Sequence, residues 1–115
     1  MTLLTEELRE KLIKIGLDVE KGANEFDLQP PVKLFNPCGA GTWLLSFIYP
    51  DEPNLAFGLA DLGQGFPETG DIYLPELEQF RGKFGLGIER DLHFTPSKSL
   101  RKYADEAHEK GSLIA

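Results

Sequence analysis

The spacing of apolar residues near the start of the chain predicts a helix. Leu8, Leu12 and Ile15 recur at the i, i+4, i+7 positions that share one helix face. Thr5 precedes them and is a good N-cap residue, while Gly16 stands where helices commonly end in the left-handed conformation. We therefore predict a first helix that begins after Thr5 and ends before Gly16.

The middle of the chain alternates apolar and polar residues between short turns rich in Pro and Gly, which predicts strands at residues 32–35, 42–49, 55–59 and 71–74. In residues 42–49 the alternation places on one face Trp43, Leu45, Phe47 and Tyr49. Leu44 and Ile48 fall on the other face, which indicates that both sides are partly covered. If no helix covers them, that face offers a homodimer interface. Turns this short join antiparallel strands, because parallel strands need long crossovers.

The last third of the chain predicts two helices around one further strand. Pro75 suits the first turn of a short helix that stops at Gly82, and residues 88–94 alternate as a fourth or fifth strand. A last helix begins at Ser97 or Ser99, ends at Gly111 and turns inward Leu100, Tyr103, Ala104 and Ala107. The predicted fold is α+β: a small antiparallel sheet of four to five strands with an N-terminal, a short middle and a C-terminal helix.

Length and composition indicate a single domain over residues 1–115. The chain has 115 residues, 41% of them hydrophobic, which is enough for one core without metal or disulfides. No apolar run approaches the roughly 20 residues that span a bilayer, so we expect no membrane partner. The single Cys38 is typical of a reducing compartment, and we expect a cytoplasmic protein with an incidental thiol.

The net charge of −7 is unevenly distributed. Residues 34–80 contain seven acids and no Lys or Arg, whereas residues 1–33 have a net charge of −2 and residues 81–115 a net charge of +2. An all-acidic stretch lacks the cations that neutralise phosphates. Any nucleic-acid surface must therefore come from the C-terminal third.

One candidate for chemistry lies in the strand predicted at residues 88–94. Glu89, Asp91 and His93 would project from the same face, because side chains alternate along a strand. Two carboxylates and an imidazole suit a divalent metal or an acid–base pair, so a metal-dependent hydrolase is one alternative. His108 would join only if the fold brings it there. The simpler interpretation is the solvated face of a half-buried strand, and we assign no catalytic residue, metal or cofactor.

A second candidate is the basic start of the last helix, formed by Lys98, Arg101 and Lys102. Bases near a helix N-terminus oppose the helix dipole, so a phosphate or an acidic partner would account for them. A nucleic-acid-associated accessory protein is therefore the other alternative. The simpler interpretation is that pairing of Arg101 with Asp105 and of Lys102 with Glu106 offsets the dipole locally.

The run LPELEQFRGKFGLGIERDLHF at residues 74–94 is distinctive in length and order. Together with the LTEELR start at residues 4–9, Trp43 and the FGL strand at residues 57–59, it resembles a family of small bacterial proteins of unknown function. That family is frequent on plasmids and other mobile elements. The resemblance covers nearly the whole chain; it implies a plasmid or mobile-element setting and carries no assigned activity.

Arg81 and Arg90 are the basic residues of that run. They would hold a carboxylate or phosphate, or Arg90 would be partly buried and paired with a Glu or Asp. With no coherent catalytic group of residues, we expect a non-catalytic interaction or regulatory module that binds a protein. Its candidate contact residues are Arg81, Arg90, Lys98, Arg101 and Lys102.

Overall fold

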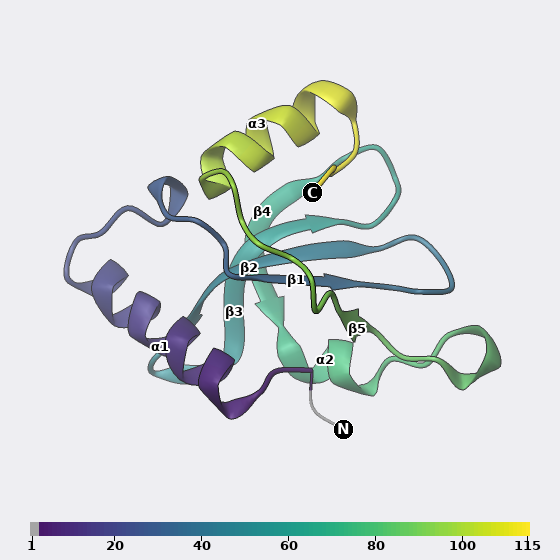
Figure 1. Ribbon diagram of the computed structural model, residues 1–115, viewed down its shortest axis with the longest axis horizontal. Helices are drawn as coiled ribbons and strands as arrows, with labels where there is room; N and C mark the ends of the chain where they lie inside the picture. The colour runs from purple at the N-terminus through teal and green to yellow at the C-terminus, as the bar shows by residue number, and fades with distance from the viewer. Residues whose placement is uncertain (1–2) are drawn as a thin grey trace.

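The computed structural model describes residues 3–115; Met1 and Thr2, which belong to the predicted domain, lie outside the described residues. The α+β prediction is confirmed (Figure 1). The helices are α1 (Glu6–Glu20), α2 (Leu74–Gln79) and α3 (Leu100–Lys110), with short 3-10 turns η1 (Glu25–Asp27) and η2 (Lys83–Gly85). The strands are β1 (Val32–Phe35), β2 (Thr42–Tyr49), β3 (Glu52–Asp61), β4 (Glu68–Tyr73) and β5 (Glu89–Arg90). No helix within residues 3–115 is long and apolar enough to cross a membrane.

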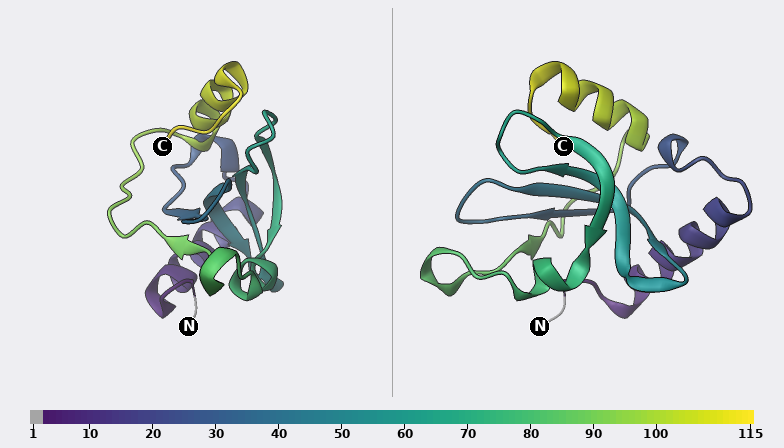
Figure 2. Two further views of the ribbon diagram at one scale, coloured as in Figure 1. Left: turned by 90° about the vertical axis from the view of Figure 1, so that its right-hand side faces the viewer. Right: turned by 180° about the vertical axis from the view of Figure 1, so that it is seen from behind.

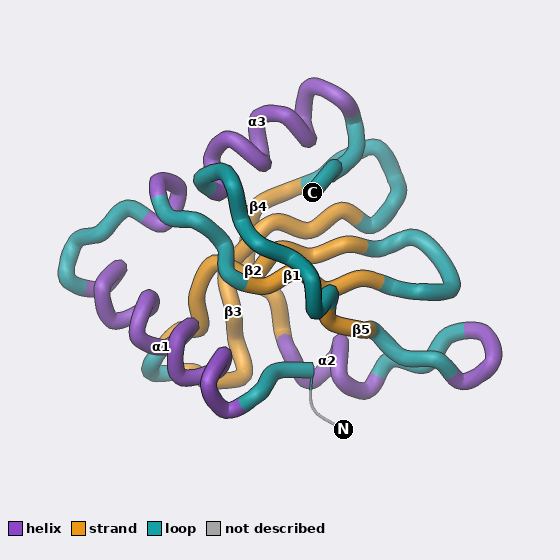
Figure 3. The backbone as a smooth tube through the Cα atoms, in the orientation of Figure 1, coloured by secondary structure: helices purple, strands orange, loops and turns teal. Residues whose placement is uncertain are grey.

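The five strands form one antiparallel sheet in the order β4-β3-β2-β1-β5 (Figure 3). The first four strands follow one another as a meander, as their short turns predict. The chain then returns through α2 and a loop, residues 80–88, and places β5 beside β1 at the opposite edge. The distinctive run at residues 74–94 therefore connects the two edges of the sheet.

The first helix is longer than its sequence predicts, because α1 continues through Gly16 to Glu20. The predicted start is confirmed: the Thr5 side chain accepts the Leu8 N–H at 3.1 Å. Gly16 is buried inside the helix, and a Cβ there would lie 2.2 Å from the carbonyl oxygen of Ile48. This glycine lets α1 approach β2 closely and does not end the helix.

The face assignment within β2 is wrong beyond Leu45. Leu45 pairs with Gly58 and Phe47 pairs with Phe57, so β2 has one extra residue, Ser46, opposite β3. Such a bulge reverses the alternation of side chains that follow it. As a result Trp43, Leu45 and Ile48 share one face of the sheet, and Phe47 stacks on Phe57 on the other, with ring centroids 5.4 Å apart.

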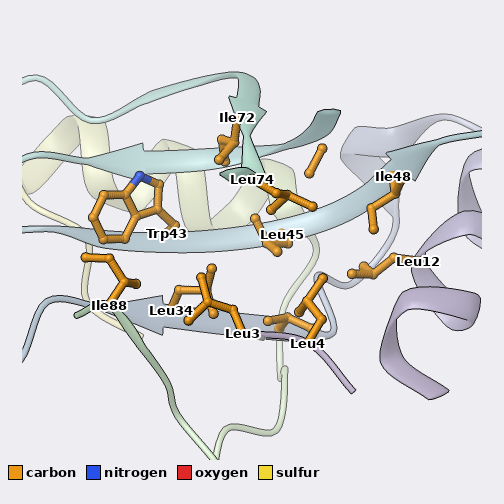
Figure 4. Close-up of a cluster of buried hydrophobic side chains, with 12 residues drawn as sticks. Leu3, Leu4, Leu12, Leu34, Trp43, Leu45, Ile48, Ile72, Leu74 and Ile88 are labelled. Atoms are coloured by element: carbon orange, nitrogen blue, oxygen red, sulfur yellow. The ribbon is translucent and has the colours of Figure 1, made fainter. Parts of the chain in front are cut away.

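The first face of the sheet carries the larger core (Figure 4). Leu12 of α1, the N-terminal Leu3 and Leu4, and Leu74 of α2 pack onto it. Figure 4 places Leu12 and Ile48 at one end of this cluster and Trp43 at the other. The buried members are Leu3, Leu4, Leu12, Val32, Leu34, Trp43, Leu45, Ile48, Ala56, Ile72, Leu74 and Ile88.

The second face is covered by α3, whose predicted features are confirmed. Ser99 is the N-cap, its side chain accepting the Lys102 N–H at 3.2 Å, and Gly111 ends the helix in the left-handed conformation. The buried residues are those predicted: Leu100, Tyr103, Ala104 and Ala107. They pack on Leu44 and Leu59, so Leu44 is covered by a helix and does not offer the open dimer face considered above.

The strand predicted at residues 88–94 is wrong beyond Arg90. Only Glu89 and Arg90 pair with β1. Asp91 Oδ1 then accepts the His93 N–H at 2.9 Å, and this local bond turns the chain away from the sheet. Asp and its short side-chain bonds favour such turns, and here that preference overrides the alternating pattern.

Across the second face, the hydroxyl of Tyr49 donates a 2.6 Å hydrogen bond to Asp71 Oδ1. Burial, then that hydrogen bond, then the charges of Asp71 and Glu25 raise the pKa of Tyr49 from 10.0 to about 12. Because the folded pKa exceeds the unfolded one, this contribution to stability is complete below about pH 10 and is lost as the pH rises towards 12. The titration of Tyr49 is measured as the difference in tyrosinate absorbance between the wild type and Tyr49→Phe. We expect this difference to appear with a midpoint near pH 12. A midpoint near 10 contradicts the hydrogen bond between Tyr49 and Asp71.

Candidate functional site

The loop at residues 80–88 projects from the body of the protein (Figures 1 and 3). It exposes apolar side chains. Phe84 at its tip is 91% exposed, and Phe80 and Leu86 in the same loop are also exposed. Leu92, just beyond β5, is 73% exposed. A group of exposed apolar side chains on one edge is typical of an interaction site, whereas single exposed ones are ordinary.

The backbone of this loop holds Phe84 outward in an unfavourable conformation. The Gly82 N–H donates to the Leu86 carbonyl at 2.8 Å, and the Gly85 N–H donates to the Gly82 carbonyl at 3.1 Å. Between them Phe84 has φ 61° and ψ 18°, the left-handed region, which no other non-glycine residue described here adopts. That conformation costs a bulky residue roughly 1–2 kcal/mol. The loop therefore displays an aromatic ring at an energetic cost.

A cleft of about 460 Å³ lies on one side of α2, and we call it the Trp43 cleft. Its apolar floor belongs to the core that covers the first face of the sheet, and Phe80 of the projecting loop is at its border. The floor residues are Trp43, Ala60, Ile72, Leu77 and Ile88. Figure 4 shows Trp43 and Ile88 at the same end of the core.

The charges that line the Trp43 cleft are all negative among the described residues. Glu76 is exposed on α2, and Asp71 belongs to β4. The Asp71 carboxylate is engaged by the Tyr49 hydroxyl on the second face, so Glu76 is the acid available at the cleft. A cleft with an apolar floor and a carboxylate at its edge favours an apolar group that carries a cation beside it.

A second cleft, of about 380 Å³, lies between α2, β5 and the N-terminal segment, and it is lined by both predicted arginines. Arg81 Nη1 donates to the carbonyls of Phe80 and Glu78, at 2.6 and 3.0 Å. Arg90 Nη1 donates to the Leu3 carbonyl. Arg90 is half-buried as predicted, but the predicted carboxylate partner is wrong. The arginine instead ties the N-terminal segment to β5 through a backbone oxygen.

The three residues considered for a metal do not share a face. Glu89 is exposed on β5, whereas Asp91 lies beyond the strand with its Oδ2 3.7 Å from Lys33 Nζ. Asp91 and His93 line a shallow cleft of about 390 Å³ with Lys98, but Glu89 is not among its lining residues. Over residues 3–115 no group of three or more His, Cys, Asp or Glu side chains is arranged to hold a metal ion. His108 is exposed in the last turn of α3.

The basic residues near the start of α3 are paired, but with other acids than the sequence suggests. Lys98 Nζ lies 2.6 Å from Glu106 Oε2, and Arg101 Nη2 lies 3.1 Å from Asp27 Oδ1 of η1. The hydrogen bond from Lys98 is the largest cause that lowers the pKa of Glu106. The predicted pair of Arg101 with Asp105 is thus replaced, because the fold brings η1 beside α3. The charge of Lys102 also lowers the pKa of Glu106, as its predicted pairing implies, but Lys98 makes the direct contact. Lys102 is exposed.

Cys38 is a free, half-buried thiol in the turn between β1 and β2. Its backbone N–H donates to Asn36 Oδ1 at 3.0 Å, a bond that shapes the turn. The residue thus has a structural place in that turn, and this geometry assigns no chemistry to its sulfur.

A family model described as "Protein of unknown function (DUF2958)" matches residues 3–114. The chain belongs to the DUF2958 family. No curated protein and no solved structure matches it. In this DUF2958 member the distinctive run at residues 74–94 builds α2, the projecting loop and β5, and it contributes to both clefts that flank α2.

Sequence reasoning identified the two arginines of this edge but missed Phe84 and the Trp43 cleft. The available signal was the sequence Gly-Lys-Phe-Gly at residues 82–85, a large aromatic residue between turn-forming glycines. An aromatic residue in such a turn has no neighbouring strand or helix face to pack on. In this DUF2958 protein, the glycines on either side of the aromatic residue are therefore the sequence signal that it is exposed.

Proposed function

We propose that this protein is a non-catalytic protein-interaction module, in the cytoplasm of a bacterium, that serves a plasmid or other mobile element. Its contact surface is the loop at residues 80–88. The observation that carries the proposal is Phe84, 91% exposed and held in a left-handed conformation. An aromatic anchor displayed in this way contributes to a complex when a partner buries it. The setting rests on the resemblance of the run at residues 74–94 to plasmid-borne proteins.

The charges around Phe84 indicate the chemistry of the partner. Arg81 and Lys83 precede it in the loop and are exposed. An apolar pocket bordered by carboxylates would therefore complement the loop, because opposite charges at the rim guide association and fix its register. Lys83 supplies an exposed cation at the tip, whereas Arg81 is bonded to backbone carbonyls at the base.

The two alternatives have weaker support. A nucleic-acid role through α3 needs cations free to neutralise phosphates, and ion pairs with Glu106 and Asp27 occupy Lys98 and Arg101. A metal-dependent hydrolase needs Glu89, Asp91 and His93 together, and the turn after Arg90 separates them. Binding that falls steeply with salt would favour the first alternative, and stabilisation by added Zn²⁺ or Mn²⁺ the second.

The proposal is tested with Phe84→Asn and the matched control Phe66→Asn. Both phenylalanines are exposed in glycine-containing loops, 91% and 78%, so both substitutions remove the same ring. Asn tolerates the left-handed conformation, so Phe84→Asn leaves the fold as stable as before or slightly more stable. Burying a phenyl ring contributes about 1.5–3 kcal/mol, so we expect a Kd at least tenfold weaker.

The measurement begins with affinity capture from a nuclease-treated lysate of the native host. The captured protein is identified, purified and titrated calorimetrically against the wild type and both variants. A partner held equally by the wild type and Phe66→Asn but weakly by Phe84→Asn supports the proposal. Equal binding by all three proteins would refute the loop as the contact surface.

A further inference from the structure

We infer that the partner of the loop is a second copy of this chain, and that the Phe84 tip of each protomer enters the Trp43 cleft of the other. This inference rests on the proposed contact surface and names its occupant. It joins two features that lie beside each other: an exposed aromatic ring preceded by two cations in the loop, and an apolar cleft with a carboxylate at its edge.

The cleft has the size and the surface that an aromatic ring needs. A cavity of about 150 Å³ lined by apolar side chains binds a benzene ring. The Trp43 cleft, at about 460 Å³, is open to solvent and provides room for the Phe84 ring and part of its flanking loop. Trp43 and Ile72 in its floor would contact the ring, and aromatic pairs gain from edge-to-face or offset packing.

The charges of the two features are complementary. Eleven of the twelve residues that line the cleft come from residues 34–80, the segment that has seven acids and no Lys or Arg; the twelfth is Ile88. The tip belongs to the segment with net positive charge, and Lys83 stands directly before Phe84. With the ring in the cleft of a partner, Lys83 would lie toward Glu76 on the exposed edge of α2.

The placement of both features on one edge allows a symmetric pair. Phe80 borders the cleft and precedes Phe84 by four residues, so at most about 14 Å of chain separates them. In a two-fold dimer one self-complementary patch meets its own copy, and each protomer inserts its tip while it receives the other. The loop projects away from the body of its own protomer, which leaves the tip available (Figure 2).

The test is sedimentation equilibrium of purified wild type and variants from about 10 μM to about 1 mM, concentrations that span weak dimer affinities. We expect a transition from the 12.8 kDa chain to twice that mass. Phe84→Asn should weaken the dimer at least tenfold, and Phe66→Asn should leave it unchanged. Lys83→Glu and Glu76→Lys should each weaken it roughly threefold or more, because each puts like charges together.

The decisive variant combines Lys83→Glu with Glu76→Lys in one chain, which restores opposite charges across the interface. We expect it to dimerise within about twofold of the wild type. Lys21→Glu and Glu10→Lys, at exposed positions of the α1 region, are the matched controls for net charge. The inference is overturned by a 12.8 kDa mass throughout, by masses beyond the dimer, by a dimer insensitive to Phe84→Asn, or by a double variant as weak as the single ones.

Failure of this inference is distinguishable from failure of the proposed function. A monomeric protein that still captures a different partner through Phe84 overturns only the second copy as occupant. A monomeric protein whose captured partners ignore Phe84→Asn overturns the contact surface as well. Dimerisation that depends on Phe84 and is restored by the charge exchange supports both.

Discussion

Replacement of Gly16 by alanine is expected to lower the free energy of unfolding by about 1–3 kcal/mol. Helix propensity alone predicts the opposite sign, since alanine in the middle of a helix is favoured over glycine by roughly 0.5–1 kcal/mol. The contact with β2 decides between them. A Cβ at this position would lie 2.2 Å from the carbonyl oxygen of Ile48 and 3.0 Å from Cδ of Pro50, so α1 must move away from the sheet.

The measurement is urea unfolding of the wild type, Gly16→Ala and Gly70→Ala. Gly70 lies in β4 with open space around its missing side chain, and its φ is not positive. The same substitution there should change stability by less than about 0.5 kcal/mol. A Gly16→Ala variant more stable than the wild type would mean that α1 does not pack this closely on β2.

Gly16 also shows why the start of α1 was predictable and its end was not. The start has a local signal, because the Thr5 side chain bonds a backbone N–H three residues on. A glycine after an apolar stripe, however, either ends a helix or allows a close approach to another element. Only the position of β2 in the fold distinguishes these two roles, and sequence spacing carries no information on it.

In the sheet, too, the features with local causes were predictable and those with long-range causes were not. Short turns predicted the antiparallel meander correctly, because turn length is a local property. The bulge at Ser46 was not predictable from alternation, since one extra residue changes the faces of Phe47 and Ile48 without changing the pattern. Beside the bulge, β2 and β3 approach closely at Gly58, where a Cβ would lie 1.8 Å from the Leu44 carbonyl oxygen.

In the candidate site, residue types were predictable and their partners were not. Arg81 and Arg90 do line one cleft, but both donate to backbone carbonyls, which have no signature in the sequence. Arg101 pairs with Asp27, 74 residues away, where local spacing suggested Asp105. The arguments from i, i+4 spacing apply within one helix and cannot find an acid that tertiary packing supplies.

Leu12→Ala should have the largest effect on stability, a loss of about 2–5 kcal/mol. Leu12 is the residue of α1 that is fully buried in the first core, where it packs together with Ile48 and the N-terminal leucines. Truncation removes its apolar contacts and leaves a cavity that the helix and sheet fill only in part. The loss is measured by urea or thermal unfolding with a circular dichroism signal.

Leu17→Ala in the same helix is the matched control, because it deletes the same atoms from a side chain that is 43% exposed. We expect a loss below about 1 kcal/mol there, since most of the cavity term is absent at a surface. The ratio of the two losses thus reports which face of α1 the sheet buries. Equal losses would contradict the orientation of α1, and with it the placement of the N-terminal segment that Arg90 holds against β5.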